Sequence, residues 1–183
     1  MLNELLELER ELIAVGHPVI ESLQPGLTEP ELLKLFKPLR LLVPPELLEL
    51  YKWHNGVSNF NHQPSGKVDF LPLGIFFPFS LALEQYEEYR RRYGAHLWPI
   101  MGSGDSDNYL INLSYDKKHH GKIYFASIPL RQKPYIQFTS LTHMVEVLIA
   151  CYRDKAYVIG SDNFLDLRDD LEKKVFARFG VET

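Results

Sequence analysis

The chain has 183 residues, of which 45% are hydrophobic and 13% aromatic, a composition typical of one folded domain and not of a disordered chain. Twenty Lys and Arg against 24 Asp and Glu give a net charge of −4, too mild to favour nucleic acid. A single cysteine, no signal-peptide pattern at the start and no apolar run approaching a membrane span (about 18 residues) predict a soluble, cytoplasmic protein without membrane contact.

Three helices are predicted in the first 56 residues. Leucines spaced three or four apart line one side of residues 2–15, and Gly16 ends that helix. Residues 28–36 open with a Thr-Glu-Pro-Glu capping box and form the second helix. The third helix has Pro45 in its first turn, and Asn55-Gly56 favours a left-handed stop.

The rest of the chain is predicted to alternate short strands with helices. Residues 67–77 form one or two short strands, and Ser80 is expected to cap a helix over 81–93. In YLINL, alternate residues share one face, which we expect to be buried: Tyr109, Ile111 and Leu113. The remaining elements are strands at 96–101, 108–114, 121–128 and 135–138, and helices at 140–153 and 163–179.

This order of elements predicts the fold class. The short strands are spaced for hairpins, without helical crossovers between them. We therefore expect an α+β fold, with a mostly antiparallel sheet of short strands flanked by N- and C-terminal helices. Residues 1–183 are expected to form one domain, and the docking of the first 25 or so residues on it is left open.

The sequence GSGDSDN is the first candidate for chemistry. As a calcium loop it would need glycine where Leu110 stands and glutamate where Asp116 stands. As a dinucleotide fingerprint it has Asp107 in place of the third glycine. We favour a turn between two strands with solvent-facing Asp105 and Asp107. The alternative is an acidic site that holds a divalent cation, as in a metal-assisted hydrolase.

Histidine and cysteine give little evidence for catalysis. His119 and His120 are adjacent, so on an extended chain their side chains point in opposite directions and chelate poorly. His143 and Cys151 lie two helical turns apart, about 12 Å, which is too far for a thiol–imidazole pair. Cys151 is expected to be a small buried apolar residue. We therefore predict neither an enzyme nor a bound cofactor or metal.

The segment Trp53-His54-Asn55-Gly56 has two interpretations. In one it is a helix C-cap, with Trp53 packed inward and Gly56 left-handed. In the other, Trp53 is an aromatic residue that faces a partner beside a polar loop. The residue pattern favours the first interpretation.

Four segments follow one another in a characteristic order: VPPELLELYKWHNGV, LWPIMGSGDSDNYLINLS, GKIYFASI and FTSLTHMVEVLIACY. Together they resemble the SUKH superfamily, whose fungal members regulate cell-wall synthesis and many of whose bacterial members are immunity proteins. The similarity covers about residues 40–155. The helix predicted at 163–179 and the N-terminal helix are extensions, and Asn112 stands where the family often has aspartate.

The resemblance implies a non-catalytic module that binds a protein. The first hypothesis is an immunity-type protein that neutralises a toxin, for example a nuclease, because a mildly acidic protein can cover a basic groove. The alternative is a regulatory or scaffold protein with a non-toxin partner. The partner, the binding face and the oligomeric state remain open. Candidate partner-binding residues are Trp53, Asn55, Asp105 and Asp107.

Overall fold

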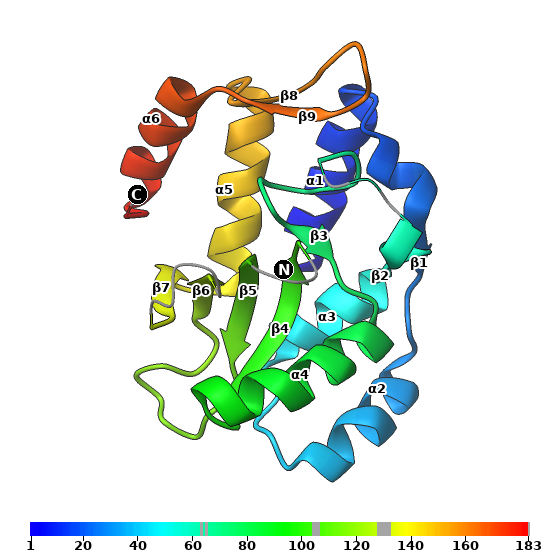
Figure 1. Ribbon diagram of the computed structural model, residues 1–183, viewed down its shortest axis with the longest axis vertical. Helices are drawn as coiled ribbons and strands as arrows, with labels where there is room; N and C mark the ends of the chain where they lie inside the picture. Colours follow the sequence, from blue (N-terminus) through cyan, green and yellow to red (C-terminus); the bar gives the residue numbers. More distant parts are fainter. Residues whose placement is uncertain (63, 65, 104–106, 128–132, 183) are drawn as a thin grey trace.

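The computed structural model describes residues 1–62, 64, 66–103, 107–127 and 133–182 (Figure 1). Within them, helices and strands follow one another in the order that an α+β chain predicts. The helices are α1 (Leu2–Ala14), α2 (Glu29–Phe36), α3 (Pro45–Trp53), α4 (Phe79–Tyr93), α5 (Leu141–Arg153) and α6 (Asp169–Phe179). The strands are β1 (Leu23–Pro25), β2 (His54–Val57), β3 (Ile75–Phe76), β4 (Leu97–Gly102), β5 (Asp107–Asn112), β6 (Ile123–Ser127), β7 (Tyr135–Phe138), β8 (Tyr157–Ile159) and β9 (Leu165–Leu167).

The main sheet has five strands in the order β3-β4-β5-β6-β7, and every neighbouring pair is antiparallel. Two further antiparallel pairs, β1-β2 and β8-β9, lie outside this sheet. The predicted α+β class with an antiparallel sheet is therefore confirmed. Within the described residues, no helix is both long and apolar enough to cross a membrane.

Strand β5 is buried on both of its faces. Tyr109 and Ile111 belong to the main core, as alternation predicted. Leu110 points to the opposite face, where it packs with Tyr89 of α4 and Leu97 of β4. The main sheet is therefore covered by α4 on one side of its β4-β5 part and by the main core on the other, which is why YLINL is apolar almost throughout.

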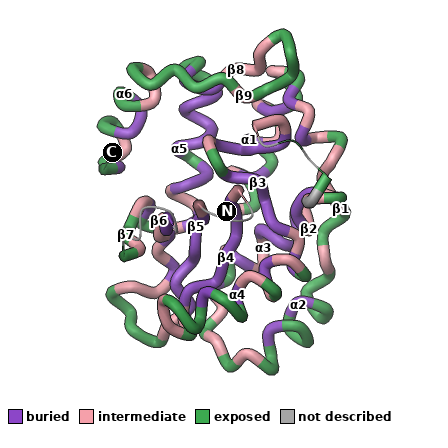
Figure 2. Tube along the Cα trace, viewed as in Figure 1, coloured by how far each residue is buried: buried purple, intermediate pink, exposed green. Residues whose placement is uncertain are grey.

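Helix α5 is the centre of the main core. It lies between α1 and α6, and nine of its 13 residues are buried (Figures 1 and 2). Ser140 caps it, because its hydroxyl accepts the His143 N–H at 3.0 Å. Helix α1 docks on α5 through its leucine stripe, and these side chains are at most 1% exposed: Leu5, Leu8 and Leu12. The N-terminal helix is therefore part of the core.

The predicted helix over 163–179 was wrong at its N-terminal end. Helix α6 begins at Asp169, and residues 165–167 form β9, which pairs with β8. Asn163 has φ +65°, a left-handed conformation that a helix cannot include and a hairpin turn favours. Phe164 and Leu167, which a helix over 163–179 would place on one apolar stripe, are 37% and 40% exposed.

The junction between α3 and α4 also differs from prediction. Helix α3 ends at Trp53, His54 is extended, and Asn55-Gly56 form part of β2 instead of a left-handed helix stop. Helix α4 begins at Phe79 and not after Ser80. Its first N–H, that of Phe79, donates to Oδ1 of Asn55 at 2.9 Å, a capping residue 24 positions earlier in the sequence.

Gly56 is needed for the close approach of β2 to the chain before α4. A Cβ atom at Gly56 would lie 2.2 Å from the Pro78 nitrogen and 2.4 Å from the Phe77 carbonyl carbon. Its φ of +69° adds the strain that a side chain suffers in the left-handed region. Gly16 has a similar φ of +66°, but nothing lies within 4 Å of its Cβ position.

The substitution Gly56→Ala should therefore lower the free energy of unfolding by more than about 3 kcal/mol, since the backbone of Gly56 or that of Phe77 and Pro78 must move. Gly16→Ala should cost only about 1 kcal/mol, the conformational strain alone. Urea denaturation of both variants gives the comparison, and equal losses would contradict this account of the β2 contact.

Candidate partner-binding surface

Trp53 and Asn55 both use their polar groups inside the fold. Trp53 is 9% exposed, and its Nε1 donates to Glu9 Oε2 of α1 at 2.8 Å. Its ring meets Phe70 edge-on, with the centroids 6.2 Å apart. Asn55 caps α4, and its carbonyl oxygen accepts from Gln24 Nε2 at 3.0 Å. These contacts hold both side chains against neighbouring parts of the fold, which they support.

Asp107 stands where β5 begins. Its N–H donates to the Ser103 hydroxyl at 3.2 Å, and its carbonyl oxygen accepts the Ser103 N–H at 2.9 Å. The preceding pair in register is Gly102 with Asn108, so the GSGDSDN segment joins two adjacent antiparallel strands. Asp105 lies outside the described residues, and an acidic site formed by the two aspartates therefore stays an untested prediction.

A row of aromatic rings leads outward from the core near Asp107. Tyr109, Phe125 and Tyr135 are paired across β5, β6 and β7, with centroid distances of 5.2 and 5.8 Å. Tyr109 is 8% exposed and Tyr135 is 45% exposed. Burial raises the pKa of Tyr135, and the charge of Asp107 raises it further. The outer end of the row therefore offers an apolar ring in a negative field.

The loop over residues 66–74 is organised by a buried carboxyl group. Asp69 is 2% exposed, and its Oδ1 accepts the Gly66 N–H at 2.8 Å. The Leu73 backbone N–H also lowers the pKa of this carboxyl group, against the effect of burial. The predicted strands over 67–77 reduce to β3 and a single bridge between Asp69 and Ile75, because the carboxyl group curls the chain between them.

Three side chains from separate elements fasten this loop by its carbonyl oxygens. His17, between α1 and the 3₁₀-helix at Pro18–Ser22, donates from Nε2 to the Asp69 carbonyl at 3.0 Å. Tyr152 of α5 donates its hydroxyl to the Phe70 carbonyl at 2.9 Å. The Tyr109 hydroxyl donates to the Pro72 carbonyl at 3.4 Å. Loop 66–74 is therefore tied to the N-terminal segment, the central helix and the sheet.

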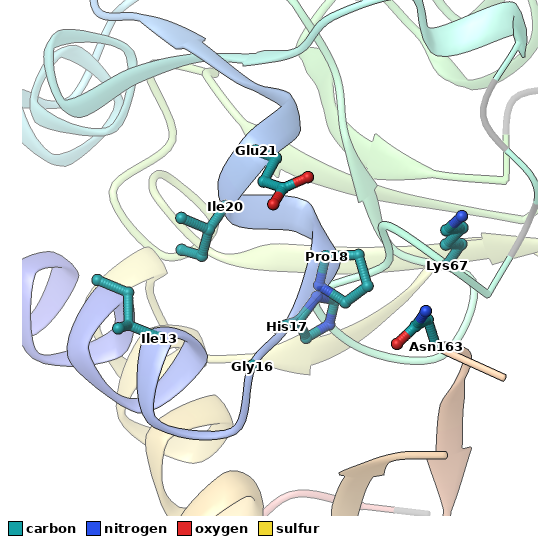
Figure 3. Close-up of a pocket in the computed structure, with 8 residues that line it drawn as sticks. All are labelled: Ile13, Gly16, His17, Pro18, Ile20, Glu21, Lys67 and Asn163. Atoms are coloured by element: carbon teal, nitrogen blue, oxygen red, sulfur yellow. The ribbon is translucent and has the colours of Figure 1, made fainter. Parts of the chain in front are cut away.

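A hollow of about 380 Å³ lies beside loop 66–74, where α1 meets the following 3₁₀-helix (Figure 3). Ile13 and Ile20 line one side of it, and Lys67 and Asn163 lie on the other. It combines an apolar wall with the Lys67 ammonium group, the Asn163 amide and the Glu21 carboxyl group. Such a recess can receive a side chain of a partner, but it holds no nucleophile paired with a base.

His17 and Asp69 are buried neighbours whose pKa values shift in opposite directions, that of His17 downward and that of Asp69 upward. Burial lowers the pKa of His17 to about 4, against a weaker opposing effect of its bond to the Asp69 carbonyl. Its Nδ1 accepts the Val19 N–H, so the neutral ring carries its proton on Nε2. Burial likewise raises the pKa of Asp69 to about 6, although two backbone N–H groups favour its ionised form.

The histidines and cysteine considered above have ordinary structural roles. Burial raises the pKa of the Cys151 thiol to about 12, which leaves it protonated and unreactive at neutral pH. His119 Nδ1 is paired with the Tyr124 hydroxyl at 2.6 Å, and His120 Nδ1 with the Ser114 carbonyl at 3.0 Å. Over the part of the chain that the structure describes, no three His, Cys, Asp or Glu side chains converge as metal ligands.

Residues 26–146 match the family model described as SMI1 / KNR4 family (SUKH-1). The chain belongs to the SUKH-1 family. The matched region contains loop 66–74, Trp53, Asn55 and Asp107, whereas α1, His17, the β8-β9 hairpin and α6 lie outside it. No curated protein matches the chain.

Sequence reasoning did not find Asp69, His17 or Leu73. Asp69 sits in VDFLPLG, where a lone aspartate between apolar residues signals a buried polar group. Nothing in the sequence around His17 marks its contact with a residue 52 positions away. The Pro72-Leu73-Gly74 tripeptide is a turn signal that we had interpreted as part of a strand.

The two buried groups predict a specific dependence of stability on pH. The raised pKa of Asp69 adds stability that is complete below about pH 4 and lost as the pH rises through 6. The lowered pKa of His17 does the reverse: its contribution is complete above pH 6.5 and lost as the pH falls through 4. Each effect is about 3 kcal/mol, so they nearly cancel in the wild-type protein.

Removing one group should therefore reveal the pH dependence of stability that the other group contributes. Relative to wild type, Asp69→Asn should become more stable as the pH rises from 4 to 6.5, and His17→Gln should become less stable from pH 4 to 6. Chemical denaturation at intervals across this range measures both slopes. Parallel pH profiles for the three proteins would show that these groups do not titrate as described.

Proposed function

We propose that this SUKH-1 protein binds another protein, and that the partner is a toxin which it neutralises as a dedicated immunity protein. Membership of the SUKH-1 family is the observation that carries the proposal. The resemblance to bacterial members of the superfamily supplies the role. The net charge of −4 supports an acidic protein that meets a basic partner, such as a nuclease whose substrate groove is positive.

The proposed contact surface consists of loop 66–74 and the outer end of the aromatic row. Tyr135 and Leu73 supply exposed apolar groups, 45% and 40% exposed, and we assign Asp107 a charged contact beside Tyr135. We assign Trp53 a supporting role, because its ring packs on Phe70 of loop 66–74. Asn55 supports the same region by fixing the start of α4. A central apolar contact with charge near it is the usual anatomy of a tight interface.

A regulatory or scaffold role with a non-toxin partner is the second candidate. The observation in its favour is a groove of about 660 Å³, whose lining comes from α1, α5, α6 and the residue after α5. Ile149 and Ala150 form its floor, and the ion pairs Arg153–Glu7 and Arg178–Asp154 lie along it. Helices α1 and α6, which lie outside the family match, complete this groove on either side of α5.

Co-expression separates the two functions. A toxin encoded beside the gene should stop bacterial growth when expressed alone, and this protein should restore growth and form a complex recovered by size-exclusion chromatography. Glu88→Lys is an exposed charge reversal on α4, which contributes no residue to the proposed surface, and it should rescue as well as wild type. A stable complex with a non-toxin protein, combined with no rescue by the wild type, would contradict the immunity role and support the regulatory one.

A further inference from the structure

Leu73 occupies a backbone position that does not suit a leucine. Residues 71–74 form a turn closed by the Gly74 N–H, which donates to the Leu71 carbonyl at 2.9 Å. Pro72 and Leu73 are the two central residues, and Leu73 has φ +62°. At the second central position of a proline-led turn, a positive φ favours glycine or asparagine, because a Cβ atom is crowded by its own backbone.

The fold imposes this conformation firmly. The Tyr109 hydroxyl donates to the carbonyl of the preceding Pro72 at 3.4 Å. The Phe70 N–H donates to the Gly74 carbonyl at 3.0 Å and fixes the other side of the turn. A Cβ atom at Gly74 would lie 2.1 Å from a Leu71 methyl group, so a larger residue there would have to displace the buried Leu71 side chain.

Much of the Leu73 side chain faces solvent in spite of this strain. Leu73 is 40% exposed. Asparagine would fit the conformation and suit the solvent, yet an apolar branched residue is present. Strained residues that the surrounding structure holds in place are typical of binding sites, where the strain keeps a group in its binding geometry.

We propose that Leu73 is the apolar anchor through which this protein binds its partner, and that the partner is a protein with a leucine-sized apolar pocket bordered by cationic side chains. The Tyr109 hydroxyl joins the turn to the aromatic row, so Leu73 and Tyr135 lie at the two ends of one connected structure. The Asp107 charge at the Tyr135 end accounts for the cationic border, by charge complementarity. This inference rests on the proposed function and names the chemistry of its partner.

The test begins with the isolated protein and a matched control. Leu42 is also 40% exposed, but its backbone is not in the left-handed region. Leu73→Gly and Leu42→Gly remove the same side chain and add the same backbone freedom, so the difference between them reports the strain. We expect a melting temperature about 2–4 °C higher for Leu73→Gly than for Leu42→Gly. An equal or lower value would show that Leu73 serves the fold, and would overturn the inference.

Binding is then measured with the purified toxin encoded beside the gene, by isothermal titration calorimetry. Leu73→Gly and Leu73→Asn should weaken binding by about 30-fold or more, as expected for a central anchor, whereas Leu73→Met and Leu42→Gly should stay close to wild type. If Leu73→Gly binds the toxin with wild-type affinity, the role of Leu73 as an anchor is contradicted, while the proposed function is not. A wild-type protein that leaves the toxin unbound contradicts the proposed function, and the anchor with it.

Discussion

The buried carboxyl group of Asp69 is the constraint on which the proposed binding surface depends. It accepts the Gly66 N–H, and the Leu73 backbone, seven residues further along the chain, also favours its ionised form. A carboxyl group that is 2% exposed loses most of its hydration, and backbone donors are what make its burial tolerable. The closed loop that results turns its carbonyl oxygens towards the core and Leu73 towards solvent.

Three separate parts of the fold each contribute one hydrogen-bond donor to loop 66–74. Tyr109 comes from the sheet, Tyr152 from the central helix and His17 from the segment after α1. His17 precedes the part of the chain that matches the SUKH-1 family model, whereas the loop lies inside it. The N-terminal extension therefore does more than cover α5. It completes the hydrogen bonding of a loop in the family region, and its ring is neutral so that Nδ1 can accept while Nε2 donates.

The regular elements could be predicted because their signals are local. The capping box at Thr28, the Ser140 cap and the alternation in YLINL each specify structure within a few residues, and all three are present. The errors fall where distant contacts decide. Gly56 is left-handed because Pro78 lies against it, not because a helix ends there, and α4 starts early because Asn55 reaches it from β2.

The candidate site shows the same division between features set by local signals and features set by distant contacts. Asp107 could be placed at a strand end from its neighbours in sequence, and the structure puts it there. Asp69 could not be recognised in advance, since the donors that satisfy it and the carbonyl it leaves for His17 appear only when the loop has closed. Trp53 seemed a partner-facing aromatic in one interpretation, but whether a tryptophan faces out or in depends on α1, whose docking the sequence left open.

Amide hydrogen exchange in wild type and Asp69→Ala tests the role of this carboxyl group most directly. The account predicts that exchange protection is lost across the amides of residues 66–74, Gly66 and Gly74 included, while the amides of α5 keep theirs. Unchanged protection of these loop amides in Asp69→Ala would contradict it, because the loop would then hold its shape without the group said to organise it.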